Sequence, residues 1–385
     1  MDSREALIQL NQVRGLGSAT IHRLLSALGS AEAVFRAAPA AWREILGRFA
    51  TDEVMEGLRR AGQGEGLAEE LERARKRDAR ILTLLDADYP ALLRQIPDPP
   101  PALYVQGALL AEDEAAVAMV GTRAATPYGL SAARELAAEL ARAGVTVVSG
   151  LAEGIDAAGH EGALEGGGRT LAVVGHGLST IYPARHVKLA GRIAGSGAVV
   201  SEFPMWMPPA QMNFPRRNRV IAGLSLGVVV VEAPEKSGAL ITAREAMEQG
   251  REVFGVPGPI TSRASRGVNA LLRDGAGVVT GAEDILHALA PRLGEHLARY
   301  QVQKAGSVPG AAATAGRQTS SSGSDSGAGL EARVLAQVPA GNAVTVDALA
   351  AATELPAARL LPLLTELEIR GVVRQMPGKG FTRSR

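Results

Sequence analysis

The sequence predicts an α/β fold: a Rossmann-like, doubly wound and mostly parallel sheet, flanked by a small N-terminal all-α domain and a C-terminal winged-helix domain. Three observations predict it. From residue 115 onward, short apolar runs alternate with helical segments, which is typical of repeated strand–helix units. The runs lack polar alternation, as expected of strands that are buried on both faces. Helical periodicity dominates both ends of the chain.

The strands of the predicted sheet are short and rich in Val and Ala. Helical segments such as Ser131–Arg142 and Ala239–Gln249 lie between most of them. Ligands of such sheets bind beyond the carboxyl ends of the strands, so the turns after these runs are the expected site. The predicted strands are Ala116–Val120, Val145–Ser149, Thr170–Val174, Ala198–Ser201, Leu226–Glu232, Glu252–Val256 and Ala276–Thr280.

Composition divides the chain into four segments. Residues 1–80 carry apolar residues at helical spacing, and residues 81–300 form the extended Rossmann-like core behind an irregular, proline-rich strap. Residues 301–329 are dominated by Ala, Gly, Ser and Thr, which indicates a flexible linker. Residues 330–385 combine three short helical segments with a terminal hairpin, which indicates a winged helix-turn-helix.

The overall charge is close to balanced. The chain of 385 residues has 41 Lys and Arg against 40 Asp and Glu, a net charge of +1. This excludes a protein that coats nucleic acid or membrane by bulk charge. The positive charge is local: Arg gathers at 214–219 and basic residues again at 370–385, whereas acids concentrate in helical segments such as 52–72. The mixed charges of residues 52–80 are interpreted as a solvated helix face.

Several classes of site and location are excluded. With 0 Cys, the chain has no disulfide framework, thiolate metal site or cysteine nucleophile. The His residues show no metal-ligand spacing, so no metal is expected. No signal-peptide pattern opens the chain, and no apolar run approaches the ~18 residues of a membrane span. We expect a cytoplasmic protein with no membrane partner.

The first predicted strand ends in Gly121–Thr122–Arg123. Glycine allows backbone N–H groups to close on an anion, and Arg123 adds a planar, permanent charge suited to phosphate. The alternative is an ordinary strand-to-helix turn with a solvent-exposed Arg. The turn matches neither G-x-G-x-x-G nor a P-loop, so we expect no dinucleotide cofactor and no ATP hydrolysis.

Two further glycine-containing turns are expected at the same edge. The first holds Ser149, Gly150, Gly154 and Asp156, and the second holds Ser237, Gly238 and Thr242. Asp156, Ser149 and Ser237 are alternatively helix caps. Several such turns on one edge account for the 45 glycines and would line a common groove.

A basic segment, Phe214–Pro215–Arg216–Arg217–Asn218–Arg219, opens a predicted helix. Arginines at a helix start are disfavoured by the helix dipole, so an anion is expected to compensate them. Phosphates on Arg216 and Arg219, a base stacked on Phe214 and a polar contact from Asn218 fit a single-stranded nucleic-acid site. The alternative is a set of Arg–carboxylate pairs that hold the domain together. Near the N-terminus, Gly15–Leu16–Gly17 resembles a helix-hairpin-helix turn or, alternatively, a simple interhelical turn.

Taken in order, these motifs resemble DNA processing protein A, the DprA/Smf family. The resemblance covers about residues 85–290, and the two ends fit a sterile-alpha-motif-like or helix-hairpin-helix domain and a winged helix. The segments that carry it are Tyr89–Leu93, Asp98–Pro100, Val120–Arg123, Ser149–Asp156, Phe214–Ser225, Val231–Ala233, Ser237–Ala243 and Val256–Gly258.

The resemblance implies a non-catalytic protein that binds incoming single-stranded DNA during natural transformation, protects it and helps to load the recombinase RecA. It also implies a homodimer through the Rossmann-like core. The family pocket, made by a Gly-Ser/Thr-Arg turn and a Phe-Pro-x-Arg-Asn-Arg helix, carries over to Gly121, Thr122, Arg123, Phe214, Arg216, Asn218 and Arg219. Ala184 stands where a Lys is common in the family. Arg185 beside it is expected to replace that Lys as a phosphate contact, with Lys188 nearby.

Two alternative functions, each of a different class, remain open at this stage. A phosphoribohydrolase of the lysine-decarboxylase-like Rossmann group would share the Gly-rich strand ends, with Glu232 as its candidate carboxylate. Its Pro-Gly-Gly-x-Gly-Thr run is absent, and Ser237–Thr242 stands there instead. A transcription regulator that uses only the winged helix is the other alternative.

Overall fold

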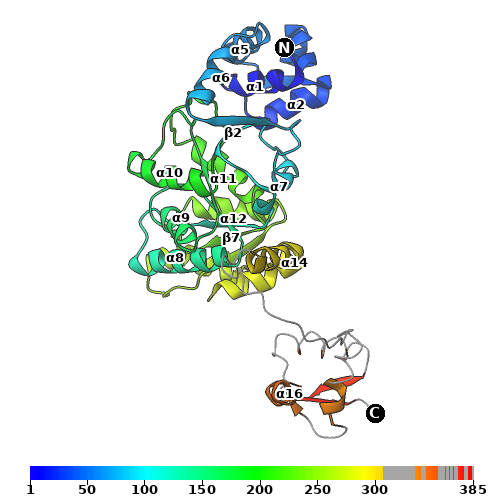
Figure 1. Cartoon of the computed structure of the whole chain (residues 1–385). Coiled ribbons are helices and arrows are strands. Elements are labelled where there is room, and N and C mark those ends of the chain that lie inside the picture. The colour runs from blue at the N-terminus through cyan, green and yellow to red at the C-terminus, as the bar shows by residue number, and fades with distance from the viewer. Residues whose placement is uncertain are drawn as a thin grey trace, which may run out of the picture. The chain divides into compact units, whose positions relative to one another are not determined.

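The computed structural model describes residues 1–306, 334–339, 344–353, 360, 364, 367, 372–376 and 380–383. The chain forms two compact units, Met1–Val308 and Pro309–Arg385, which are described separately (Figure 1). Most of the predicted linker lies outside the described residues.

A nine-stranded sheet forms the centre of the first unit, in the order β1-β2-β6-β5-β4-β3-β7-β8-β9. The strands from β6 to β9 run parallel, whereas β1 pairs antiparallel with β2, and β2 with β6. This confirms the predicted doubly wound sheet, and all seven predicted strands are present. The strands are β1 (Ala79–Thr83), β2 (Ala102–Gly107), β3 (Ala116–Val120), β4 (Thr146–Ser149), β5 (Thr170–Val174), β6 (Ala198–Ser201), β7 (Gly227–Val230), β8 (Glu252–Gly255) and β9 (Gly277–Val278).

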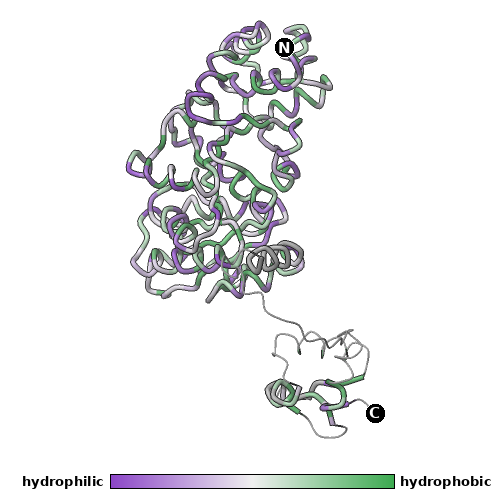
Figure 2. The backbone as a smooth tube through the Cα atoms, viewed as in Figure 1, coloured by the Kyte–Doolittle hydropathy of each residue, from purple (hydrophilic) through white to green (hydrophobic). Residues whose placement is uncertain are grey.

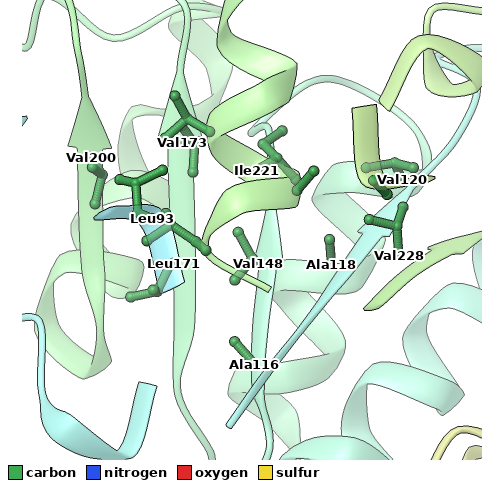
Figure 3. Close-up of a cluster of buried hydrophobic side chains, with 14 of the residues drawn as sticks. Leu93, Ala116, Ala118, Val120, Val148, Leu171, Val173, Val200, Ile221 and Val228 are labelled. Atoms are coloured by element: carbon green, nitrogen blue, oxygen red, sulfur yellow. The ribbon is translucent and has the colours of Figure 1, made fainter. Parts of the chain in front are cut away.

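Helices cover both faces of this sheet because successive strand residues point to opposite sides. On one side, Val117 and Met119 of β3 pack with α8 (Pro127–Arg142), α9 (Ile155–Glu165) and α14 (Ala282–Gly306). The same face is covered further along by α10 (Val187–Ser196). On the other side, Ala118 and Val120 pack with α7 (Ala91–Arg94), α11 (Asn213–Gly223), α12 (Ala239–Glu248) and α13 (Arg266–Arg273). Figure 3 shows Ile221 of α11 and Leu93 of α7 among the strand side chains of this second layer.

The N-terminal helices form their own core but belong to the same compact unit. Ile8 packs with Ala102 and Tyr104 of β2, and the predicted boundary at residue 80 falls inside β1. In Figure 2, hydrophilic and hydrophobic stretches alternate along these helices, as expected of helices with one buried face. They are α1 (Ser3–Gln12), α2 (Ser18–Leu28), α3 (Ala31–Arg36), α4 (Pro39–Leu46), α5 (Asp52–Gly62) and α6 (Leu67–Lys76).

The two ends of the predicted core differ from expectation in detail. Helix α14 continues to Gly306, past the predicted boundary at residue 300. The strap, expected to be irregular, contains α7 and β2. Four 3-10 helices complete this unit: η1 (Gly47–Phe49), η2 (Ala111–Glu114), η3 (Ala184–His186) and η4 (Arg263–Ser265).

The second unit contains a three-stranded antiparallel sheet in the order β10-β12-β11 and the helix α16 (Val346–Thr353). Leu360, Leu364 and Leu367, at the spacing of the third predicted helix, are buried with Phe381 in its core. Helices with a terminal hairpin are the arrangement predicted for a winged helix. The strands are β10 (Val344–Thr345), β11 (Val373–Met376) and β12 (Gly380–Arg383).

Candidate functional site

A cavity of about 340 Å³ opens beyond the carboxyl ends of β3 and β7. Strand order reverses between these two strands, and ligands of open α/β sheets bind at such switch points. The turn after β3 and the first turns of α9, α11 and α12 line this cavity, which we call the switch-point pocket. It brings together these predicted residues: Gly121, Thr122, Arg123, Asp156, Phe214, Asn218, Ser237, Gly238 and Thr242.

Close backbone packing holds the turn after β3 in place. The N–H of Thr122 donates to the carbonyl of Glu232 at 2.7 Å. A Cβ on Gly121 would lie against Ile155 and 2.8 Å from the same carbonyl oxygen. Gly154 has a φ of +78°, and its Cβ would meet the carbonyl oxygens of Thr122 and Arg123. These two positions therefore require glycine, and the turn places Arg123 at the rim of the pocket.

Arg123 and Phe214 form the exposed face of the pocket. The Arg123 guanidinium lies 5.1 Å from the centroid of the Phe214 ring, and the Tyr182 ring lies 6.2 Å from that centroid. Arg123 makes no hydrogen bond or salt bridge to any residue that the structure describes. A free guanidinium beside a ring can bind a phosphate while a base stacks on the ring.

The floor of the pocket contains Arg217, which was not among the predicted contact residues. Its guanidinium is buried and donates to the carbonyls of Gly150, at 2.8 Å, and Val173 and to Oδ1 of Asn218, at 3.1 Å. Burial lowers the pKa of Arg217 to about 10, although the nearby Asp156 carboxylate opposes this shift. Arg217 therefore stays charged at neutral pH. Arg217 is the first Arg of the Phe-Pro-x-Arg-Asn-Arg pattern, so this pattern could have identified it from the sequence.

Two of the three predicted helix caps, Asp156 and Ser149, cap no helix. Asp156 does not cap α9, which begins after Gly154; its carboxylate accepts from the N–H groups of Gly150 and Ala152 at 3.1 and 3.3 Å. Burial raises the pKa of Asp156, although Arg217 opposes this shift. Ser149 is buried and donates to the carbonyl of Met119, so it also caps no helix.

The third predicted cap, Ser237, directly precedes Gly238, the N-cap residue of α12. Its hydroxyl accepts from the N–H of Ala239 at 3.3 Å. Residues of the first turn of α12 line the pocket, so the positive end of this helix dipole lies beside it.

Seven predicted contact residues do not line the pocket: Ser149, Gly150 and Gly154 in the segment after β4, and the basic residues Arg185, Lys188, Arg216 and Arg219. Arg219 is 7% exposed and pairs with Glu202 at 2.5 Å and Asp98 at 3.3 Å, so it holds the domain together as the alternative interpretation proposed. Arg216 is exposed but faces a neighbouring groove. Arg185 pairs with Glu153, and Lys188 is exposed on α10.

The carboxylate of the enzymatic alternative is engaged elsewhere. Both oxygens of Glu232 accept from Thr126, from its N–H at 2.8 Å and its hydroxyl at 2.6 Å, and Glu232 does not line the pocket. His176, at the same sheet edge, is buried between the Gly177 carbonyl and the Tyr182 N–H. Among the described residues, no group of His, Asp and Glu has a geometry that could hold a metal ion. No helix in the described part of the chain is long and apolar enough to cross a membrane.

The sheet and pocket define a Rossmann-like protein with an arginine-lined pocket at its switch point. Residues 80–290 match the family model of DNA recombination-mediator protein A, and residues 318–379 match the DprA winged helix domain. The chain therefore belongs to the DprA/Smf family, and its C-terminal domain is a winged helix.

Curated relatives and solved structures agree with this family. Protein Smf of Escherichia coli is 50% identical over 210 residues, which are 54% of this chain and 56% of that protein. DNA processing protein DprA of Bacillus subtilis is 40% identical over 57% of this chain and 74% of its own. The crystal structure of DprA from Streptococcus pneumoniae aligns with a TM-score of 0.65 and 33% identity, over 74% of this chain and 98% of its own.

A structure of DNA processing protein A from Helicobacter pylori, described for its single-stranded DNA binding mode, aligns with a TM-score of 0.50 and 32% identity. It covers 55% of this chain and 97% of its own.

Proposed function

We propose that the switch-point pocket binds single-stranded DNA and that the chain acts as a non-catalytic recombination mediator. The observation that carries this proposal is the unpaired Arg123 guanidinium beside the accessible Phe214 ring, in a pocket that also holds Arg217 and the start of α12. Cations interleaved with a ring suit a strand whose bases are unpaired. The single-stranded DNA binding of the Helicobacter pylori relative supports the same ligand.

Within this proposal the pocket residues have separate roles. Arg123 contacts a phosphate, Phe214 stacks on a base, and Asn218 donates to a base edge or supports the turn. Ser149, Gly150, Gly154 and Asp156 shape the floor around Arg217, and Ser237, Gly238 and Thr242 present the start of α12. Arg185 and Lys188, which follow Tyr182 in the chain, are the basic residues that a longer strand would reach.

The family also suggests a cellular role. We propose that the chain is cytoplasmic, forms a homodimer through its Rossmann-like core, protects incoming single strands and loads RecA onto them during natural transformation. RecA filament formation on an oligonucleotide covered by single-strand binding protein, measured with and without this chain, tests the loading step. No acceleration would overturn it.

Salt-titrated binding of a single-stranded oligonucleotide tests the pocket. Arg123→Ala is expected to weaken binding for all sequences and to reduce the magnitude of the slope of log K against log salt by about 0.7, the contribution of one phosphate on a single strand. Arg43→Ala is the matched control, because Arg43 is an exposed arginine of α4 outside the pocket. Unchanged affinity and slope for Arg123→Ala would overturn the assignment.

A further inference from the structure

A second and larger groove, of about 880 Å³, lies between the N-terminal helices and the core. It adjoins the switch-point pocket, because Pro215 and Ile241 line both. One wall is the turn between α1 and α2 that contains Gly15 and Gly17, and the opposite wall is the segment 202–208 after β6. We call this cavity the interdomain groove.

Arginines stacked on aromatic rings line this groove. The Arg14 guanidinium lies 4.6 Å from the centroid of the Trp206 ring, and that of Arg216 lies 5.5 Å from the Phe203 ring. Phe49, which also lines the groove, is 38% exposed, and the guanidinium of Arg48 lies 5.0 Å from its ring.

The rings of this groove are a large fraction of the few aromatic residues in the chain. The whole chain has only 6 Phe, 2 Trp and 5 Tyr, yet Phe49, Phe203 and Trp206 line this one groove. Arg14 and Arg216 make no hydrogen bond or salt bridge within the described part of the chain. Their cations are therefore available to phosphates, as Arg123 is in the pocket next door.

The acidic side chains of the groove do not cancel these cations at its rim. Glu202 and Asp98 are both paired with the buried Arg219. Glu245 is half-buried, and burial beside Glu248 and Asp98 raises its pKa. The negative charge therefore lies at the floor around Arg219, whereas Arg14 and Arg216 are exposed.

The turn between α1 and α2 adds backbone donors beside Arg216. Gly15 has a φ of +78°, and Gly17 precedes the first residue of α2. A Cβ on Gly17 would lie 3.3 Å from Nη2 of Arg216, so the turn approaches this side chain closely. The first N–H groups of a helix have no partner within the helix and are suited to a phosphate next to that guanidinium.

We propose that the interdomain groove is a second subsite for the same single strand. The strand leaves the switch-point pocket over Pro215 and Ile241, places phosphates on Arg216 and Arg14, and stacks a base at Trp206. This inference rests on the proposed function of the pocket. It assigns the N-terminal helices a direct part in DNA binding.

Oligonucleotide length separates the two subsites. A strand of about 6 nucleotides fills one subsite, and one of about 20 spans both, given typical site sizes. Arg14→Ala and Trp206→Leu are expected to weaken binding of the long strand roughly tenfold and to leave the short strand unaffected. Arg43→Ala, an exposed arginine of the same helical domain, is expected to bind both strands like the parent chain.

The outcomes distinguish the two proposals. If Arg123→Ala weakens both strands while Arg14→Ala behaves as Arg43→Ala does, the groove proposal is wrong and the pocket stands. If Arg123→Ala leaves both strands unaffected, the proposed function itself is wrong. If a peptide or protein prevents the long strand from binding, and DNA does not displace that peptide or protein, the groove is the site of a protein partner. That result would overturn the proposal.

Tryptophan fluorescence gives a direct readout that does not depend on affinity. The chain has 2 Trp, and Trp42 is buried with its indole N–H bonded to the Val34 carbonyl at 2.7 Å. The long strand is expected to quench the emission of Trp206, and Trp206→Phe is expected to abolish the quench while it retains most of the affinity. Bound long strand without any quench, or an equal quench in Trp206→Phe, would overturn the base contact at Trp206.

Discussion

Three arginines that are neighbours in sequence have three different surroundings in α11. Arg217 is buried at the floor of the switch-point pocket, Arg219 pairs with Glu202 and Asp98, and Arg216 stacks on Phe203 in the interdomain groove. Successive residues of a helix are rotated by about 100°, so adjacent side chains point in different directions. Only the rotation of α11 against the sheet decides which arginine meets which partner.

Arg219 illustrates a residue whose loss acts on stability. Arg219→Ala leaves Glu202 as an unpaired, buried carboxylate, which is expected to lower the free energy of unfolding by about 3–5 kcal/mol. Urea denaturation measures this, with Arg43→Ala as the control. Adding Glu202→Gln to the variant is expected to recover part of the loss; an unchanged unfolding midpoint for Arg219→Ala would contradict the ion pair.

The buried His160 is expected to make the free energy of unfolding depend on pH. It is fully buried, and burial lowers its pKa from 6.5 to about 3. Its Nδ1 lies 2.7 Å from the Thr170 hydroxyl, whereas Nε2 has no hydrogen-bond partner among the described residues. The unfolded chain therefore takes up the proton first, and stability is lost as the pH falls below about 6.5, by about 2 kcal/mol at pH 5.

Urea unfolding at pH 7.5 and pH 5, on the parent chain and on His160→Leu, measures this contribution. The parent is expected to lose more stability than the variant between the two pH values. The carboxyls of Asp156 and Glu202, whose pKa values are raised by burial, shift stability in the opposite direction but cancel in the comparison. Equal pH dependence in both proteins would contradict the role of His160.

Helix α8 is fastened to the end of β7 by one carboxylate. Glu232 follows β7 and accepts two hydrogen bonds from Thr126, the N-cap of α8. A Cβ on Gly129 would collide with the Glu232 side chain, so the first turn of α8 lies directly on it. This contact sets the position of the turn that carries Arg123.

Glu232→Gln tests this structural role against the enzymatic alternative. The amide has a single acceptor oxygen, so one hydrogen bond is lost, and stability is expected to fall by about 1–3 kcal/mol. Single-stranded DNA is expected to bind with little change, because Glu232 does not line the pocket. Release of free base from nucleoside monophosphates by the parent chain, abolished in Glu232→Gln, would instead support the phosphoribohydrolase.

Strands β1 and β2 attach the N-terminal helices to the core. Neither strand was predicted: Ala79–Thr83 falls at the boundary of the N-terminal helical segment, and Ala102–Gly107 directly follows the prolines that indicated an irregular strap. Strand β1 is the edge of the sheet, and β2 pairs with β1 on one side and with β6 on the other. Their pairing brings the turn between α1 and α2 within reach of Arg216, which no local pattern indicated.

The charge of the entire chain predicts a shallow salt dependence. With a net charge of +1, binding depends on a few arginines at the two subsites and not on bulk charge. Each phosphate neutralised on a single strand contributes about −0.7 to the slope of log K against log salt, so a long strand is expected to give about −2 to −3. Titration of a 20-nucleotide strand from about 50 to 200 mM salt measures it; a slope steeper than about −6 would indicate a far larger basic surface.

The sequence by itself determined the strands of the parallel sheet, the glycine-containing turns at their carboxyl ends and the family. These are local properties: apolar runs, glycines where a Cβ does not fit, and motifs read in order. Tertiary structure decided which side chains share the pocket, that Arg217 replaces Arg219 at its floor, and that the N-terminal turn faces Arg216. Strand order, helix rotation and edge-strand pairing depend on contacts between residues far apart in the chain, and no local pattern encodes them.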